Sequence, residues 1–180
     1  MALCQSDVQE NGRDQNPMYT EVYLGLGSNL ELPVKQLGTA INLLESTLDH
    51  IEVAPIYQSK PLGPTGQADY FNTVVRGWTT LDPIKLLDAC QLIEDKQNRV
   101  RAERWGPRTI DVDILYFGTS VVKTGRLTIP HPEILNRAFV VFPLLDLMPS
   151  GSSPGGDYLD RSDYDHSSLK QINQDHKDLI

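Results

Sequence analysis

The residues with the clearest chemistry lie in the segment RVRAERWGPRTIDVDILYFG, residues 99–118. It ends in an apolar, strand-like run that contains two acidic residues, Asp111 and Asp113. Because alternate side chains of a strand point to opposite faces, both carboxylates share one face, with Cα atoms roughly 6.5–7 Å apart. Carboxylates at this spacing can bind one Mg²⁺ or a pair of them, and a cation offsets their mutual repulsion. A solvated outer face of an edge strand is the alternative, but Asp is depleted in strands, which favours the metal site. The other face is then formed by Ile110, Val112, Ile114 and Tyr116.

Positive charge is concentrated just upstream of this acidic pair. The chain carries a net charge of −8, yet residues 96–108 alone carry +4. Guanidinium groups and a carboxylate-bound Mg²⁺ together neutralise a polyphosphate, so the segment suits a metal-bound nucleotide. A salt-bridged, solvated loop is the alternative; Trp105 speaks against it, because an indole in a Gly-Pro loop is unfavourable unless it covers something. The basic residues are Lys96, Arg99, Arg101, Arg104 and Arg108.

A second group of residues could hold a flat ring. Aromatic side chains stack on ring faces, and an Asn amide offers a donor and an acceptor that match a pyrimidine-like edge. Ordinary core or strand-face packing explains these residues equally well from their chemistry alone. The candidates are Tyr70, Asn72, Trp105 and Phe139.

Three further polar residues carry less weight alone. Gln91 and Glu94 flank the apolar stripe of a predicted helix and could hydrogen-bond a nucleotide, although most such residues are surface positions. His131 lies between two prolines in an extended segment, and a lone His is more often structural than a ligand. The motif GLGSNL at 25–30 has Leu30 where a dinucleotide-binding motif has its third Gly, so we reject that function.

Strand and helix patterns alternate along the chain. Two segments have apolar residues at helical spacing: one follows Pro33, and the other opens with Asp82 as N-cap and Pro83. The order β-α-β-β-α-β predicts an α+β, ferredoxin-like fold, in which an antiparallel sheet has two helices packed on one face. The predicted strands are residues 19–25, 51–59, 70–79 and 109–117, and the long, site-bearing loops are residues 59–69 and 96–108.

The length of 180 residues predicts one folded domain, which we place at residues 19–150. Residues 1–18 are polar, as in a disordered leader, and lack the basic start and apolar core of a secretory signal. Residues 151–180 have the composition of a flexible polar tail and allow one short helix at 167–174.

Composition also excludes some classes of protein. No apolar run approaches the roughly 20 residues of a membrane span, and the negative net charge argues against a surface that binds nucleic acid. Cys4 and Cys90 have no partner at zinc or thioredoxin spacing, so we expect a reduced, cytoplasmic compartment.

Four blocks of the sequence together resemble the 6-hydroxymethyl-7,8-dihydropterin pyrophosphokinases of the folate pathway. The match runs over about residues 20–150, with the blocks in the order of that family. The resemblance implies that residues 19–150 are a ferredoxin-like pyrophosphokinase domain. It also implies transfer of a pyrophosphoryl group from ATP to the hydroxymethyl oxygen of the pterin, leaving AMP. The blocks are GLGSNL (25–30), PLGPTGQADYFN (61–72), RWGPRTIDVDIL (104–115) and IPHPEILNRAFV (129–140).

The resemblance also implies roles for individual residues. Asp111 and Asp113 match the ligands of two Mg²⁺ ions, and Arg99 and Arg108 match arginines that stabilise the transition state. Trp105 matches a residue of a loop that closes over both substrates. The positions that match the ATP site are Gln91, Glu94, Arg101, Trp105, Arg108, Ile114, His131 and Arg137. The positions that match the pterin site are Ser59, Leu62, Tyr70, Asn72, Trp105 and Phe139, with Tyr70 and Phe139 sandwiching the ring.

Two other functions stay open at this point. One is another metal-dependent, nucleotide-using transferase with an Asp-x-Asp pair, which would give a product other than AMP. The other is a ferredoxin-like RNA-binding module, in which sheet aromatics stack on bases; here the positive charge lies in one loop beside two carboxylates, which would repel RNA. We expect ATP and the dihydropterin as partners, no nucleic acid or membrane, and a monomer or weak dimer.

Overall fold

The computed structural model describes residues 18–63, 66–99, 106–167 and 169–172. Within this part of the chain, six strands form one sheet in the order β5-β1-β4-β3-β8, with β2 also paired to β4. Every neighbouring pair is antiparallel. The strands are β1 (Thr20–Ser28), β2 (Asp49–Val53), β3 (Ile56–Ser59), β4 (Tyr70–Thr79), β5 (Asp111–Phe117) and β8 (Lys170–Ile172).

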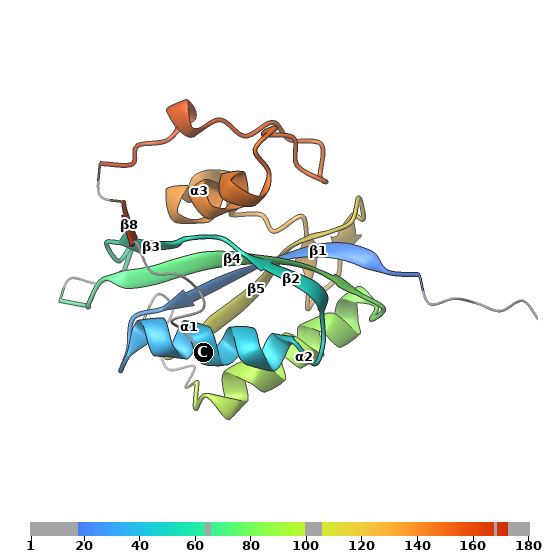
Figure 1. Cartoon of the computed structure of the whole chain (residues 1–180), viewed down its shortest axis with the longest axis horizontal. Coiled ribbons are helices and arrows are strands. Elements are labelled where there is room, and N and C mark those ends of the chain that lie inside the picture. Colours follow the sequence, from blue (N-terminus) through green and yellow to red (C-terminus); the bar gives the residue numbers. More distant parts are fainter. Residues whose placement is uncertain (1–17, 64–65, 100–105, 168, 173–180) are drawn as a thin grey trace, which may run out of the picture.

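Helices α1 (Pro33–Leu44) and α2 (Pro83–Lys96) lie on one face of this sheet, as Figure 1 shows. The Asp82 carboxylate caps α2, since it accepts hydrogen bonds from the backbone N–H groups of Ile84 and Lys85 at 3.1 and 2.9 Å. Apolar side chains of both helices and of the sheet form a first core, with members such as Leu24, Leu37, Leu86 and Ile114. The predicted antiparallel sheet with two helices on one face is therefore confirmed.

The predicted strand at 51–59 is divided at Ala54 and Pro55 into β2 and β3, and both pieces pair with β4. Pro55 has no N–H to donate to a sheet ladder, which accounts for the break. The backbone N–H of Ala54 still donates to the carbonyl of Val74 at 2.9 Å, so the chain stays against β4 across the break. Ser59 consequently ends a short strand beside the site.

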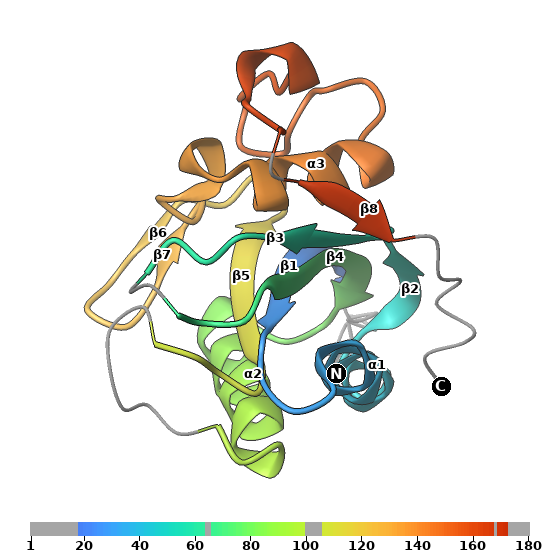
Figure 2. The ribbon, with the colours of Figure 1, turned by 90° about the vertical axis from the view of Figure 1, so that its left-hand side faces the viewer.

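A third helix, α3 (Ala138–Leu147), covers the opposite face of the sheet (Figures 1 and 2). The sequence AFVVFPLLDL is apolar on nearly all sides and contains Pro143, so it lacks the amphipathic period that reveals a surface helix. The helix packs into a second core whose buried members include Tyr23, Leu115, Tyr116, Val141 and Leu144. It follows the small hairpin of β6 (Val122–Lys123) and β7 (Thr128–Ile129) and the 3₁₀ helix η1 (Ile134–Asn136).

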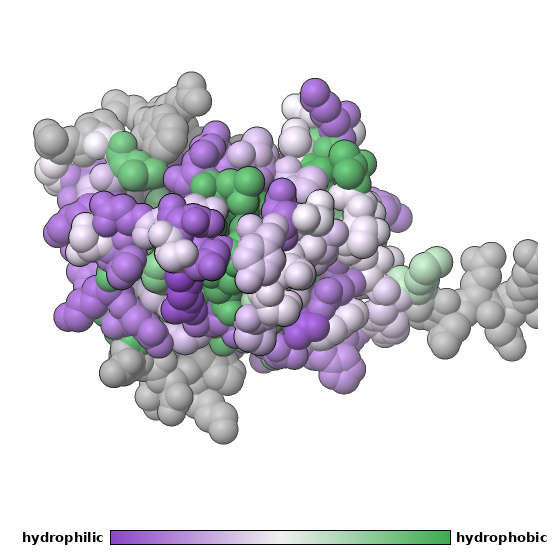
Figure 3. Space-filling model, turned by 90° about the horizontal axis from the view of Figure 1, so that it is seen from above, coloured by the Kyte–Doolittle hydropathy of each residue, from purple (hydrophilic) through white to green (hydrophobic). Residues whose placement is uncertain are grey.

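The prediction of a short helix at 167–174 is wrong. Lys170–Ile172 is instead the strand β8, which pairs with β3 beside α3 (Figure 2). Before it, the chain forms the 3₁₀ helix η2 (Arg161–Asp163) and buries Leu159 in the second core with 2% of its surface exposed. Figure 3 looks onto this side of the molecule, whose surface is mostly hydrophilic with a few apolar patches.

Two further expectations concern the leader and membrane-spanning segments. Of the leader predicted at residues 1–18, residues 1–17 lie outside the described residues. Among the helices of the described ranges, none is both long and apolar enough to cross a membrane.

Candidate functional site

The site is a pocket of about 300 Å³ between the sheet and the start of α3. Residues of β1, β3, β4 and β5, and of the segment that leads into α3, line it. The predicted site residues among its lining are Ser59, Leu62, Tyr70, Asn72, Arg108, Asp111, Asp113, His131, Arg137 and Phe139.

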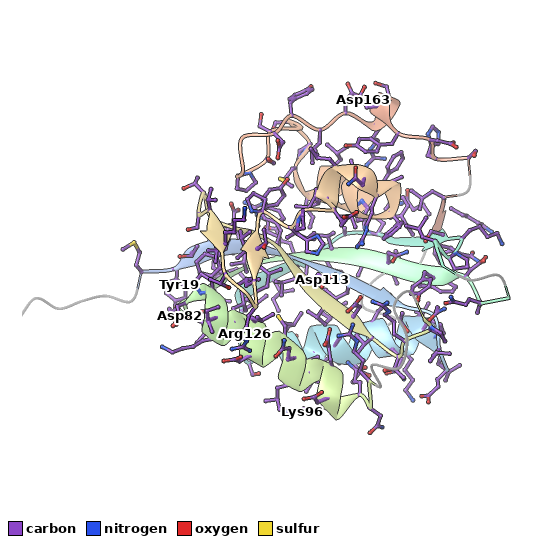
Figure 4. The ribbon with its side chains drawn as sticks, turned by 180° about the vertical axis from the view of Figure 1, so that it is seen from behind. Tyr19, Asp82, Lys96, Asp113, Arg126 and Asp163 are labelled. Carbon is purple, nitrogen blue, oxygen red and sulfur yellow. The ribbon has the colours of Figure 1, made fainter. Side chains whose placement is uncertain are left out.

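The acidic pair reaches this pocket from β5. Asp111 and Asp113 lie opposite Gly27 and Gly25 of β1, and both carboxylates line the pocket, while Val112 between them is in the first core. Figure 4 labels Asp113 near the middle of the molecule.

Tyr116 is not on the apolar face that simple alternation predicts. In the register of β1 and β5, Tyr23 pairs with Tyr116 but Leu24 pairs with Ile114, so Leu115 is an extra, bulged residue. The bulge shifts Tyr116 to the second core, where its ring packs edge-on against Tyr23 at 6.2 Å between centroids. The predicted placement of Tyr116 beside Ile114 is therefore wrong.

Two arginines meet the acidic pair. The Arg99 guanidinium contacts Asp111 Oδ1 at 2.5 Å and also the Glu94 carboxylate, while the Arg108 guanidinium contacts the other oxygen of Asp111. The Asn29 side chain positions Arg108, because its Oδ1 accepts the Arg108 backbone N–H at 2.9 Å. Positive and negative groups from the predicted basic segment and from β5 are thus side by side. Arg101 and Trp105 lie outside the described residues.

Three carboxylates are close enough to influence one another. Burial, together with the negative charges of Asp111 and Glu94, raises the pKa of Asp113 to about 7. Burial also raises the pKa of Glu94, whose Oε1 accepts the backbone N–H of Val112 at 2.9 Å. A bound cation would relieve this repulsion.

The site offers Mg²⁺ two carboxylates as protein ligands. In the described ranges, no three His, Cys, Asp or Glu side chains gather into a metal-binding group. Mg²⁺ bound by proteins usually keeps only one or two carboxylates and takes its remaining ligands from substrate phosphates and water. Asp111 and Asp113, facing one pocket, fit that donor set.

The other half of the pocket is a slot around Asn72, with 6% of its surface exposed. The Asn72 amide nitrogen donates to Ser59 Oγ at 3.0 Å and to the Tyr57 carbonyl at 3.4 Å, which fixes the direction of the amide. The Tyr70 hydroxyl donates to the Gly106 carbonyl at 2.9 Å. Phe139, in the first turn of α3, also lines the slot.

His131 and Arg137 also line the pocket. The His131 backbone N–H donates to the Leu115 carbonyl at 3.0 Å, and its Nδ1 accepts the backbone N–H of Glu133 at 3.2 Å. In the neutral ring the proton is then on Nε2. Burial and the nearby Arg137 lower the pKa of His131, which keeps the ring neutral.

Not every predicted residue lines the pocket. Gln91 Oε1 accepts a hydrogen bond from Arg126 Nη2 at 3.4 Å, and Ile114 is in the first core with 2% exposed. Glu94 and Arg99 act on the pocket from beside it, through Asp111.

Sequence reasoning missed Lys60, which lines the pocket and pairs with Asp69 at 2.9 Å. It also missed Glu133, another lining residue. Lys60 lies within the predicted loop 59–69 and Glu133 within the matched block 129–140, and their charge was the available signal.

A pocket that joins an anion site to a slot for a flat ring is typical of a group-transferring enzyme, since donor and acceptor must meet in it. Comparison with known proteins gives the particular family. The sequence model described as 7,8-dihydro-6-hydroxymethylpterin-pyrophosphokinase matches residues 23–149, and the chain belongs to this family.

Curated relatives agree with this assignment. The chain is 47% identical over 127 residues to the 2-amino-4-hydroxy-6-hydroxymethyldihydropteridine pyrophosphokinase of Haemophilus influenzae, covering 69% of this chain and 79% of the relative. It is 45% identical over 144 residues to the enzyme of the same name from Pseudomonas aeruginosa, covering 79% and 89%.

A solved structure shows the same fold. The crystal structure of wild-type Plasmodium falciparum HPPK-DHPS with pterin and p-hydroxybenzoate matches with a TM-score of 0.59 at 17% identity. The match covers 76% of this chain but only 41% of that longer protein.

Proposed function

We propose that two Mg²⁺ ions, which Asp111 and Asp113 would hold, support the reaction that this chain catalyses as a member of its family. In this reaction, a step of folate biosynthesis, the enzyme transfers the pyrophosphoryl group of ATP to the hydroxymethyl oxygen of 6-hydroxymethyl-7,8-dihydropterin, giving the pterin diphosphate and AMP. The single observation that supports these roles best is one pocket in which Asp111 and Asp113 face a slot lined by Asn72 and Phe139.

The acidic half of the pocket suits the triphosphate. Bound Mg²⁺ would neutralise phosphate charge there. Arg99 and Arg108 lie against Asp111, so their guanidinium groups are in place to stabilise the charge that moves to the leaving AMP oxygen. His131, neutral, and Arg137 line the same pocket and would hold further phosphate oxygens. The resemblance to the family also gives ATP-binding roles to Gln91, Glu94, Arg101, Trp105 and Ile114; of these, Gln91, Glu94 and Ile114 do not line the pocket.

The slot suits the pterin ring. The Asn72 amide nitrogen donates to Ser59 Oγ. This orientation leaves the amide oxygen to accept a hydrogen bond from an N–H group at the edge of the pterin ring. Tyr70 and Phe139 would stack on the two faces of the ring, with Leu62 at the rim, where 62% of its surface is exposed. Trp105 would close over both substrates. Positioning the hydroxymethyl oxygen in line with the β-phosphorus then supplies much of the acceleration.

An assay with ATP, Mg²⁺ and the dihydropterin alcohol tests this assignment. We expect AMP as the nucleotide product, and loss of turnover and of Mg²⁺-dependent nucleotide binding in Asp113→Ala. The matched control is Asp163→Asn, an exposed carboxylate on the tail, which should leave both unchanged. ADP as the product, or near-normal activity of Asp113→Ala, would contradict the proposal.

We also propose a cytoplasmic location, a monomer or weak dimer, and no nucleic-acid ligand. The net charge of −8 supports the last point. Light scattering coupled to size-exclusion chromatography measures the oligomeric state. A dimer that stays intact at micromolar concentration would contradict the proposal of a monomer or weak dimer.

A further inference from the structure

One carboxylate outside the pocket ties three elements together. The Tyr57 hydroxyl, from β3, donates to Asp146 Oδ2 of α3 at 2.7 Å. The Arg161 guanidinium, from η2, pairs with Oδ1 of the same carboxylate and lies over the Phe142 ring, with Cζ 5.1 Å from its centroid. The Tyr57 ring also packs edge-on against Phe142 at 6.1 Å. We call Tyr57, Asp146 and Arg161 the clasp.

On the strand side, the clasp is next to one wall of the slot. Tyr57 and Ser59 are two residues apart on β3, so their side chains share a face. Tyr57 lies directly opposite Asn72 in the register of β3 and β4, and its carbonyl accepts a hydrogen bond from the Asn72 amide. A displacement of Tyr57 therefore moves the Tyr57 carbonyl and Ser59 Oγ, which orient the Asn72 amide.

On the helix side, the clasp is on the same stripe as the other wall. Phe139, Phe142 and Asp146 are spaced i, i+3 and i+7 along α3 and so share one face of the helix. Phe139 is the member that lines the slot. Asp146 thus anchors, two turns away, the helix that carries Phe139.

The first turn of α3 needs such an anchor. Pro143 has no N–H, so the intrahelical hydrogen bond to the carbonyl of Phe139 is not made. The helix backbone therefore holds Phe139 less firmly than an uninterrupted helix would. Contacts of the later turns with β3 and η2, together with the second core, then help to fix how close α3 lies to the sheet.

We propose that the clasp sets the width of the slot and is a positioning device for the pterin. This inference rests on the proposed roles of Ser59, Asn72 and Phe139. The segment after α3 then affects the affinity for the pterin, because Arg161 holds Asp146 and does not itself contact the substrate. ATP binds at the acidic half and is not affected by the clasp.

Steady-state kinetics on the full chain test the proposal. Tyr57→Phe removes one hydroxyl and Arg161→Ala removes the partner on the tail. Each should raise KM for the pterin about fivefold, as expected for one hydrogen-bonding partner, and leave KM for ATP within about twofold. Arg161→Lys keeps the charge beside Asp146 and should restore most of the pterin affinity. The double variant should lose less than the product of the two single effects, because both act through Asp146.

A matched control separates this role from general stability. Tyr23→Phe removes another buried tyrosine hydroxyl from the second core, away from the slot, and should leave both KM values unchanged. The proposal would be overturned if Tyr57→Phe and Arg161→Ala left the pterin KM unchanged, or if they raised the KM values for the pterin and for ATP equally. The proposed function is judged separately: it fails if the unmutated enzyme forms no AMP, or if Phe139→Ala leaves the pterin KM unchanged.

Discussion

At the scale of single residues, the site concentrates ionisable groups that oppose one another. The negative charges of Asp111 and Glu94 act on Asp113. Arg99 contacts Asp111 and Glu94 and Arg108 contacts Asp111, while the charge of Arg137 acts on Asp113 in the opposite sense. A carboxylate in that position is costly to ionise in the folded protein, since burial and like charge both disfavour the anion. An ionised Asp113 therefore lowers the stability of the metal-free protein.

We therefore expect Asp113→Asn to stabilise the metal-free protein at pH 8. The pKa of Asp113 is raised to about 7, so the folded state holds this proton more tightly than the unfolded chain does. That contribution to stability is complete below pH 4 and is lost as the pH rises through 7. Asn does not ionise, so for a shift of about three pKa units the variant should gain on the order of 4 kcal/mol at pH 8 and almost nothing near pH 4.

Urea unfolding in the presence of a chelator, between pH 4 and 8, measures this difference. Asp163→Asn is the control for removal of an exposed carboxylate and should follow the unmutated protein. A variant that is less stable than the parent at pH 8 would show that Asp113 is held by favourable contacts instead.

Chemistry that depends on a few adjacent residues was accessible from the sequence. The shared face of Asp111 and Asp113 follows from the two-residue period of a strand, and the nearby Arg108 follows from its distance along the chain. Tyr116 was misplaced because a bulge depends on the register with β1, which no local pattern records. Lys60 was missed because a lysine in a polar loop has no periodic signal.

At the scale of elements, the slot depends on how closely two strands approach. Gly27 of β1 lies opposite Asn72 of β4, and a Cβ on Gly27 would come within 3.1 Å of Asn72 Oδ1. The Asn72 amide is held by Ser59 and by the Tyr57 carbonyl, so it cannot move aside without weakening those hydrogen bonds.

Gly27→Ala should consequently weaken pterin binding. We expect a rise of about three- to tenfold in the pterin KM, equivalent to roughly one weakened hydrogen bond. Gly125→Ala, where an added Cβ meets nothing within 4 Å, is the matched control. A pterin KM that stays the same in Gly27→Ala would mean that the Asn72 side chain has more freedom than its contacts indicate.

The predicted elements were correct where the apolar period was regular, as in α1, α2 and β4. α3 was missed because burial against the sheet and the tail makes it apolar all round, which removes the period. β8 was missed because three residues, Lys170–Ile172, are too few for alternation to be seen, and their pairing with β3 spans most of the chain.

At the scale of the whole molecule, the segment after α3 completes the second core. Leu159 is 2% exposed and belongs to the cluster that contains Tyr23 and Val141. The neighbouring backbone is shaped for this: Gly151 has a φ of +73°, and a Cβ there would come within 2.6 Å of the Leu159 carbonyl. The predicted domain boundary at residue 150 stays untested as a limit of activity, but packing continues well past it.

Leu159→Ala should destabilise the protein by about 2–4 kcal/mol, as expected for a buried leucine whose removal leaves a cavity. Urea unfolding checks this, with Tyr158→Ala as the control, because 70% of the surface of Tyr158 is exposed. Equal stability of the two variants would show that the segment adds little to the fold.

The sheet edge formed by β8 also affects association between copies of this protein. The strand has three residues, and Lys170 and Gln171 are exposed. A short, charged outer strand offers another sheet few backbone groups to bond with and resists edge-to-edge stacking. The protein should therefore stay monodisperse at high concentration as long as Lys170–Ile172 remains paired with β3. Loss of that strand would expose the backbone edge of β3, through which copies of the protein could pair.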